Sequence, residues 1–291
     1  MSPAVEIRLL VSRELRRSVR SVKGIVLGII TLLGAILTSV AVVWIEGANR
    51  EKLGAGSTEA FIQMKKEVIE KQTGDAGLAS YMASMPWSLV TFLEVTIWLG
   101  PLLIALLGFD AIAGELQHKS VRFWTVRSRR WSFFAGKLLG LWALVGMVTL
   151  ALNVIAGSVA LAKGYVTVGQ LLGWGTRFWL VGLVIAGAWA AIGTFVSSLF
   201  KQPMLSLMTT FATFFVLWLC GLGGFIARAK ATYETGITQD MSWYEYLYPN
   251  AYDTMLLSPQ PSRVLLATGI LLGFVAFVIA AGSFLFSKRD I

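Results

Sequence analysis

Six apolar segments, each long enough to cross a membrane, dominate this chain. A hydrocarbon core of about 30 Å needs about 20 apolar residues in a helix, and in lipid each segment must satisfy its own backbone hydrogen bonds. We therefore predict an all-α integral membrane protein with six transmembrane helices. The segments are Gly24–Ile45, Trp87–Phe109, Phe133–Ala162, Leu171–Phe200, Pro203–Ile226 and Val264–Phe286.

Basic residues are concentrated in alternate connections between these segments. With the N-terminus placed inside, the inner side carries 15 of the 25 Lys and Arg residues but only five of the 16 acidic residues. Connections rich in Lys and Arg stay in the cytoplasm, so both termini are expected to be cytoplasmic. The expected location is the plasma membrane, which in a bacterium is the inner membrane. The net charge of +9 reflects this topology, and nucleic-acid binding is not expected.

Two residue types that often build cofactor sites occur once each. Cys220 alone cannot form an intrachain disulfide or a Cys-based zinc cluster, and His118 alone excludes a bis-histidine haem site. No convergent set of titratable residues surrounds His118, which disfavours an enzyme. We expect this chain to bind no metal or cofactor.

Residues 1–23 are predicted to form a cytoplasmic amphipathic helix on the membrane surface. Ser2 can cap this helix and Pro3 suits its first turn. Apolar side chains recur on one face and arginines on another, which is typical of an interfacial helix beside anionic headgroups. The helix is either a lever on the first span or a topology anchor. The two faces are Ile7, Val11, Leu15, Val19, Val22 and Arg13, Arg16, Arg17, Arg20.

The two long outer segments are residues 46–86 and 227–263. The second is rich in aromatic residues and is interrupted by prolines. It forms an interfacial aromatic belt, a gate over a transport path, or both. The candidate gate residues are Trp243, Tyr244, Tyr246 and Tyr248.

Two ionisable residues lie well inside the predicted spans. Glu94 and Arg177 are roughly 10 Å and 9 Å deep at 1.5 Å per residue, and both helices enter from the outside. Charges in a membrane usually pair or face a cavity, so we predict an intramembrane pair. The alternative is that Arg177 extends to the outer headgroups.

The inner connection of residues 110–132 begins with acidic residues and ends with basic ones. It also carries apolar side chains outside the long spans, which predicts a contact surface for a cytoplasmic partner or an interfacial helix. These apolar residues are Val121, Phe123, Trp124 and Val126.

This connection resembles the type-2 ATP-binding-cassette permease family. An acid ends span two, Gly-Glu and a Ser-bearing basic turn follow, and Gly-Lys opens span three, although Lys119 stands where the family has Gly. Similar features are the loop Lys201–Pro203, the Tyr248-Pro249-Asn250 stretch and the Ser287-Lys288-Arg289-Asp290 ending. The positions that match in this connection are Asp110, Gly114, Glu115, Ser120, Ser128, Arg129, Gly136 and Lys137.

The resemblance implies a half-transporter whose permease domain is residues 24–291, an exporter by family. Two permeases, either two copies or a copy and a paralogue, would enclose a path, and two cytoplasmic ATPase subunits would drive transport. The outer aromatic region would supply short re-entrant helices that cap the path. The residues implied in coupling to the ATPase are Asp110, Gly114, Glu115, Lys119, Ser120, Arg122, Phe123 and Trp124. A local alternative pairs Glu115 with Lys119 at i+4.

The sequence contains no G-x-x-x-x-G-K-[ST] motif, and Lys137 after Gly136 is followed by Leu138. ATP and Mg²⁺ are therefore expected in the partner ATPase. The alternative functions are a secondary transporter or channel, for which no internal repeat or midplane charge is visible, and a membrane scaffold without transport activity.

Overall fold

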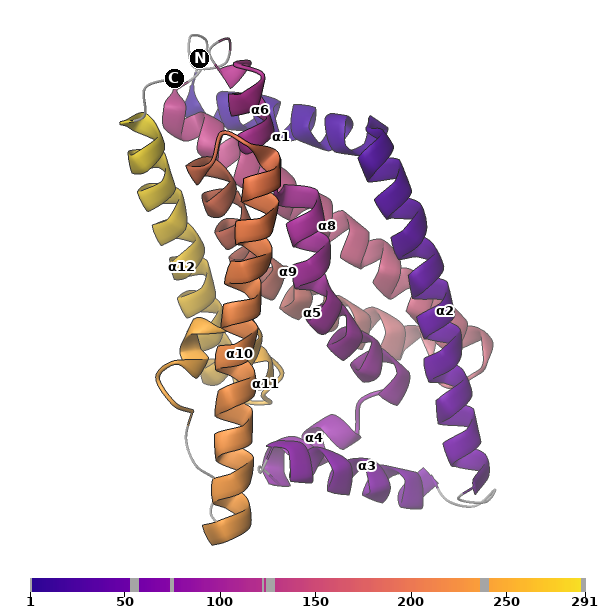
Figure 1. Ribbon diagram of the computed structural model, residues 1–291. Coiled ribbons are helices and arrows are strands. Elements are labelled where there is room, and N and C mark those ends of the chain that lie inside the picture. Colours follow the sequence, from indigo (N-terminus) through magenta and orange to yellow (C-terminus); the bar gives the residue numbers. More distant parts are fainter. Residues whose placement is uncertain are drawn as a thin grey trace.

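Among the residues that the computed structural model describes, six long helices form the body of the molecule (Figure 1). Each is long and apolar enough to span a membrane, so the predicted all-α membrane fold is confirmed. The long helices are α2 (Val22–Lys52), α5 (Trp87–Gly108), α8 (Arg130–Ala162), α9 (Val168–Leu199), α10 (Pro203–Thr235) and α12 (Pro261–Ser287). The structure describes residues 2–52, 58–73, 76–121, 123, 129–235 and 241–288.

Local sequence signals explain where several helices begin. Proline occupies the first helical position of α10 and α12, where its missing N–H costs no hydrogen bond. Thr167 and Gln170 form a reciprocal capping box at the start of α9. The turn before it contains Gly164 at φ +72°, a left-handed conformation that glycine adopts without strain.

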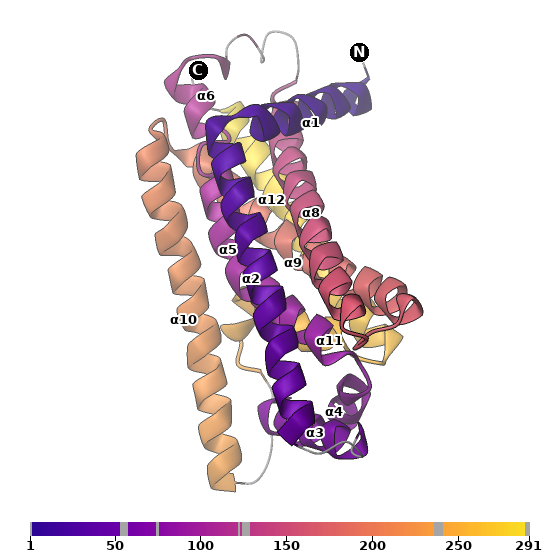
Figure 2. The ribbon, with the colours of Figure 1, turned by 90° about the vertical axis from the view of Figure 1, so that its right-hand side faces the viewer.

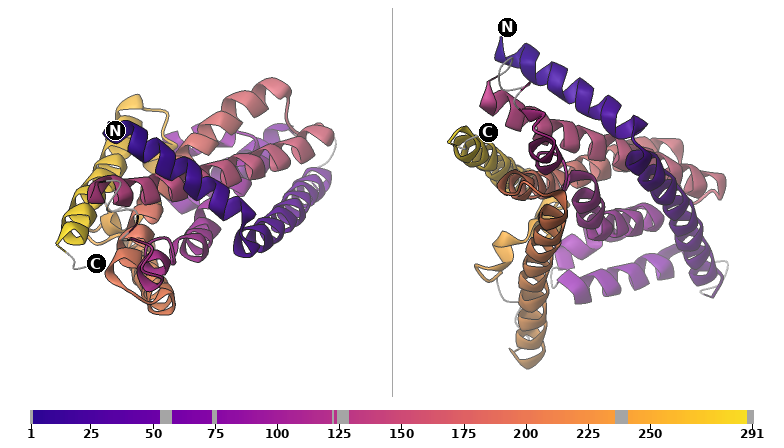
Figure 3. Two further views of the ribbon diagram at one scale, coloured as in Figure 1. Left: turned by 90° about the horizontal axis from the view of Figure 1, so that it is seen from above. Right: turned by 45° about the horizontal axis from the view of Figure 1, so that its top comes forward.

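The first helix, α1 (Pro3–Arg20), lies across one end of the bundle, at the top of Figure 1 and over the other helices in Figure 3. We call this the terminal end, because α1 begins there and α12 ends there. Leu10 and Glu14 of α1 lie against Gly136 and Gly140 of α8, where an added Cβ would come within 3 Å of their side chains. These two glycines therefore let α1 pack closely on α8.

Helix α9 lies inside the bundle, whereas α2 lies at its right-hand edge in Figure 1 and α10 at its left-hand edge in Figure 2. It contacts α5, α8, α10 and α12. In the most apolar stretch of each span, 72% of the α9 residues are buried, against 17% in α2 and in α10. The outward faces of α2 and α10 are thus free to contact lipid or another chain.

Short elements cover the opposite, far end of the bundle (Figure 1). Helices α3 (Thr58–Thr73) and α4 (Ala76–Ala83) precede α5, and Lys65 of α3 donates to the Met85 carbonyl at 2.8 Å. Between α10 and α12 lie the short helices η1 (Glu245–Leu247), η2 (Pro249–Tyr252) and α11 (Asp253–Leu256). They pack on α9, α10 and α12, so this part of the predicted outer segment belongs to the bundle.

Candidate functional site

A break between α5 and the short helix α6 (Ala113–Gln117) lies at the terminal end. Ser197 of α9 accepts the amides of Ile112 and Ala113, both at 3.1 Å, and donates to the Phe109 carbonyl. Ser206 of α10 donates to the same carbonyl at 2.7 Å. These two serines satisfy backbone groups that the break would otherwise leave unpaired. Sequence reasoning missed both serines. Each lies near the end of an apolar span, and that position is the signal that could have identified it.

The turn that ends α6 contains Lys119 in the left-handed region, at φ +54°. The Ser120 amide bonds to the Glu115 carbonyl and the Lys119 amide to the Leu116 carbonyl, which is the Schellman pattern of a helix end. Glycine is the usual residue at this position. The turn therefore explains why the type-2 permease pattern has Gly where this chain has Lys119.

Glu115 is the hub of a charged cluster between α1, α6 and α8. Its Oε1 accepts Arg17 Nη1 at 2.7 Å and Lys137 Nζ at 3.1 Å, and the side chain is only 2% exposed. Arg13 lies 3.6 Å from the same oxygen, and Ser120 donates to Oε2. The local pairing of Glu115 with Lys119 is therefore wrong, because the left-handed turn leaves Lys119 exposed and the carboxylate points into the bundle.

Lys137 links the two acidic members of this cluster. Its Nζ lies 2.6 Å from Oε2 of Glu14 on α1 as well as 3.1 Å from Glu115, and its side chain is buried. We call Glu14, Arg17, Glu115 and Lys137 the terminal network. A buried charge is tolerated only when it is paired and hydrogen-bonded, and each member has an opposite charge within bonding distance. The network therefore ties α6 to both α1 and α8.

A second ion pair joins the α1–α2 corner to the end of α5. Lys23 Nζ lies 2.6 Å from Asp110 Oδ1, donates to the Leu107 carbonyl at 3.2 Å and sits 4.1 Å from the centre of the Phe109 ring. Both side chains are about one-third exposed, at 31% and 36%. The pair thus sits at an accessible edge of the bundle.

Some of the residues that the family resemblance implies in coupling are buried in the structure, and others are exposed. Gly114 and Glu115 are buried, whereas Lys119 and Phe123 are exposed, Phe123 at 76%. Val121 was expected to be an exposed contact residue, but it is fully buried in a cluster with Leu10, Phe133 and Phe286, so that prediction is wrong. Arg122, Trp124 and Val126 lie outside the described residues.

The predicted contact between Glu94 and Arg177 is not formed. Arg177 donates instead to the Tyr81 hydroxyl and to the carbonyls of Leu257 and Ser258, the last at 2.8 Å. Similar depth in the membrane is not enough to bring the two charges together. Leu93 of α5 packs toward Gly182 of α9, the helix that carries Arg177, and Glu94 therefore projects about 100° away from α9 around the axis of α5. Glu94 is exposed.

The four candidate gate residues lie at the far end in two different environments. Trp243 and Tyr246 are exposed at 77% and 45%, whereas Tyr248 is buried against Gly221 of α10. Tyr244 is half-buried and packs edge-on against Trp243. Burial raises the pKa of Tyr248 to about 12, so its hydroxyl remains protonated. Of these four residues, Trp243 and Tyr246 are therefore the exposed ones.

A neutral hydrogen-bonded cluster, which sequence reasoning missed, surrounds Asn250 of η2. Its amide donates to the Ile97 carbonyl and the Tyr248 hydroxyl, both at 3.0 Å, and its oxygen accepts Trp189 Nε1 at 2.8 Å. Proline at position 101 has no N–H, which leaves the Ile97 carbonyl without its helical partner. Asn250 supplies that donor. We call Ile97, Trp189, Tyr248 and Asn250 the asparagine network.

An acidic group lies beside this network. Burial raises the pKa of Asp253 to about 6, although its backbone hydrogen bond from Thr254 and the nearby Arg228 act in the other direction. Glu94 lies within electrostatic range of Asp253. Arg228 itself forms an ion pair of 2.8 Å with the buried Glu245. The far end thus holds carboxylates of two kinds, one paired and one that readily keeps its proton.

A comparison with sequence models of known families agrees with this architecture. The sequence model described as "ABC-2 family transporter protein" matches residues 8–291, so the similarity begins within α1 and includes all six spans and both networks. No curated protein matches the chain.

Proposed function

The chain belongs to the ABC-2 transporter family, and from this premise we propose that it is the transmembrane permease subunit of an ATP-binding-cassette exporter, driven by a separate ATPase subunit. The observation that carries this proposal is the family match over nearly the whole chain, together with six spans. ATP and Mg²⁺ then bind to the partner, in keeping with a sequence that has no P-loop motif.

The terminal end offers the surface for that partner. Phe123 is an exposed aromatic next to the exposed turn at Lys119, and both follow α6 directly. The terminal network connects α6 to α1 and α8, and Ser197 connects it to α9. A displacement of α6 by the ATPase is therefore carried to three helices at once. Glu115 acts in this proposal as a positioning residue, because its carboxylate is enclosed by its own chain.

We assign the terminal end to the cytoplasm and the far end to the outer side of a plasma membrane, the inner membrane in a bacterium. The excess of Lys and Arg in the connections on the terminal side supports this orientation. A second permease, either another copy or a paralogue, packs against the exposed faces of α2 or α10, and the transport path lies between the two chains. Exposed Trp243 and Tyr246 then sit at the outer mouth of the path.

Affinity purification of the tagged chain in mild detergent tests the partnership. We expect an ATP-hydrolysing subunit to co-purify and Phe123→Ser to reduce its amount strongly. The matched control is Tyr246→Ser, an exposed aromatic at the far end, which should leave the ATPase bound. Recovery of the permease without any ATPase, or equal recovery from both variants, would contradict the proposed partner or the proposed surface.

Single cysteines in a Cys220→Ala background test the orientation. Lys201 at the terminal end and Gln260 at the far end are exposed in the structure. On intact cells an impermeant maleimide should label Gln260→Cys and should not label Lys201→Cys until the membrane is opened. The reverse pattern would invert the topology and remove the terminal end as a docking surface for a cytoplasmic ATPase.

A further inference from the structure

A cavity of ≈ 280 Å³ lies between α2, α5, α8 and α9. Its walls include Phe92 and Pro101 of α5 and Trp189 of α9, so it reaches the middle of the bundle. One stripe of α2, which lies at an edge of the bundle, forms one side of the cavity. That stripe consists of Leu27, Ile30, Thr31, Gly34, Ala35 and Thr38.

The cavity wall is apolar at most positions, and three of the four threonines that line it use their hydroxyls within their own helices. Thr31, Thr96 and Thr149 donate their hydroxyls to carbonyls of their own helices, at 2.6, 2.8 and 3.1 Å. An apolar cavity of about 150 Å³ stays dry and accepts a benzene molecule, so the larger space here suits a length of hydrocarbon chain. If it stayed empty, its lining would lose dispersion contacts.

A positive charge stands at the terminal edge of this stripe. Lys23 precedes Leu27 by four residues and Ile30 by seven, which places all three on one face of α2. Lys23 is held by Asp110 and the Leu107 carbonyl but remains 31% exposed. At 1.5 Å per residue the cavity begins about 6 Å below Lys23 and extends to about 22 Å. One leaflet of a 30 Å core is about 15 Å thick, so the cavity covers the depth of the leaflet on this side.

We propose that this cavity binds one hydrocarbon chain of an anionic amphiphile from the leaflet at the terminal end, with the anionic headgroup at Lys23. The inference rests on the proposed function, because it makes a lipid-like anion the substrate class of the transporter. Charge complementarity selects the headgroup, since the side chain of Lys23 is accessible and its partner Asp110 can be exchanged for an incoming anion. The cavity selects the chain by its length and its lack of polar groups.

A pair of matched glycines on α2 allows a sharp test of the cavity. At both Gly34 and Gly28 an added Cβ meets nothing within 4 Å, but only Gly34 lines the cavity. Gly34→Leu therefore fills the cavity, and Gly28→Leu adds the same side chain outside it. Both changes replace a helix glycine with a good helix former.

The probe is phosphatidylglycerol with a photoreactive diazirine in one acyl chain, incorporated with the full-length permease in nanodiscs. We expect Gly34→Leu to lower labelling of the cavity helices about tenfold, equivalent to about 1.4 kcal/mol, while Gly28→Leu labels like the parent. Equal labelling of all three proteins would mean contact with bulk lipid only and would overturn the proposal. Cross-links from this face to a second permease chain in place of lipid would overturn it as well.

The headgroup is tested with the same diazirine chain on phosphatidylcholine. The parent should label more strongly with phosphatidylglycerol than with phosphatidylcholine, Lys23→Gln should abolish that preference, and Lys23→Arg should retain it. A preference unchanged in Lys23→Gln would remove Lys23 from the site. Labelling needs no nucleotide, so it reports on the lipid site alone. Co-purification of the ATPase with each variant reports on the proposed function, and the two failures can therefore be told apart.

Discussion

The terminal network and the asparagine network both join helices that are distant in sequence, but they do so with different chemistry. The terminal network consists of opposite charges, with Arg17 half-exposed at 48% and Lys137 buried at 2%. The asparagine network is neutral and buried, and one of its acceptors is a carbonyl that Pro101 leaves free. The terminal network therefore depends on the balance of its charges. The asparagine network depends on the packing around Asn250 and on the hydrogen bond that Pro101 removes from α5.

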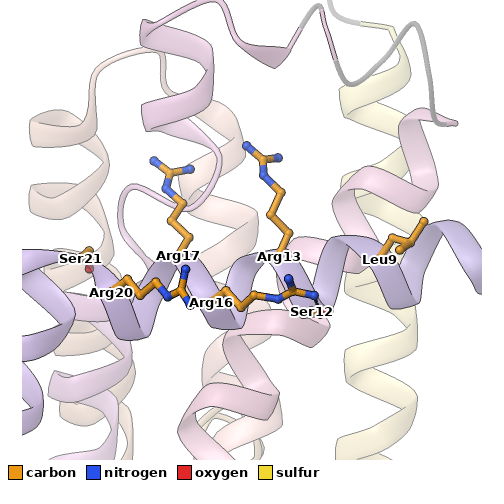
Figure 4. A pocket seen from close by; sticks show the side chains of 7 residues that line it. All are labelled: Leu9, Ser12, Arg13, Arg16, Arg17, Arg20 and Ser21. Carbon is orange, nitrogen blue, oxygen red and sulfur yellow. Dashed lines mark hydrogen bonds between the residues drawn. The ribbon is translucent and has the colours of Figure 1, made fainter.

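The difference teaches how each region can respond to a partner. Arg17, the half-exposed member of the terminal network that projects from α1 in Figure 4, can exchange its ion pair at modest cost, because water and neighbouring charges replace the lost contact. The buried pair of Lys137 and Glu115 cannot be opened so cheaply. A buried neutral cluster has no such substitute, since an unpaired donor or acceptor there costs about 1–3 kcal/mol. We therefore expect the terminal end to rearrange during transport and the asparagine network to hold α5, α9 and η2 together as one body.

Removal of Lys137 should have the largest effect on the terminal network. Lys137→Met deletes the buried cation and leaves Glu14 and Glu115 side by side with less compensation. Breaking a buried pair by removing one partner typically costs about 3–5 kcal/mol. Urea unfolding of the purified protein measures the loss, and Lys201→Met at an exposed position is the control. A loss no larger than that of the control would show that water compensates the charges.

The second prediction compares the two intramembrane charges. Arg177→Met leaves the Tyr81 hydroxyl and two carbonyls without their donor and should cost about 2–3 kcal/mol. Glu94→Gln should change the free energy of unfolding by less than about 0.5 kcal/mol, because its side chain is exposed. The two losses should add in the double variant. A strong non-additive term would restore the direct pair that the sequence predicted.

The asparagine network can be tested through the proline that makes it necessary. Asn250→Leu should cost about 2 kcal/mol, because Trp189 and the Ile97 carbonyl lose their partner. In a Pro101→Ala background the new backbone N–H can bond to Ile97, so the same change should cost less. The four unfolding free energies form a double-mutant cycle. Equal costs in both backgrounds would show that the freed carbonyl is not what Asn250 stabilises.

Asp253 should make the stability of the far end depend on pH. Its pKa is about 6 in the folded protein against an ordinary value of 3.8, so the folded state keeps its proton while the unfolded state loses it. Stability should therefore fall as pH rises from about 4 to about 6, by on the order of 2 kcal/mol at 1.36 kcal/mol per pKa unit. Thermal unfolding across this range measures it. Asp253→Asn should flatten the curve, and an unchanged slope would assign it to another group.

The smallest expected effect is a gain in stability at the turn after α6. Lys119→Gly should stabilise the protein by about 1 kcal/mol, because a side chain in the left-handed region is strained. Lys163, at the end of α8 with φ −89°, offers the matched control, and Lys163→Gly should give no gain. If the two changes alter the free energy of unfolding equally, the left-handed conformation at Lys119 does not lower the stability of the protein.

The sequence by itself determined the architecture of this protein. The lengths of its apolar segments specify six helices because a backbone in lipid has no other way to satisfy its hydrogen bonds. Local pattern also identified α1, and the family pattern marked position 119 as one that requires a glycine-like conformation. The helices depend on neighbours a few residues away or on the membrane, and such information is present in a single sequence. Position 119 was marked only by comparison with the family's pattern.

Only the tertiary structure decided the partners of the charged and polar side chains. Arg17 and Glu115 are 98 residues apart, and Trp189 and Asn250 are 61 residues apart. Such pairs depend on how each helix is rotated about its axis, and one residue along a helix turns a side chain by about 100°. Depth in the membrane alone therefore suggested Glu94 as the partner of Arg177. The rotation of the helices about their axes instead places Arg177 within hydrogen-bonding distance of the Tyr81 hydroxyl and of the carbonyls that follow α11.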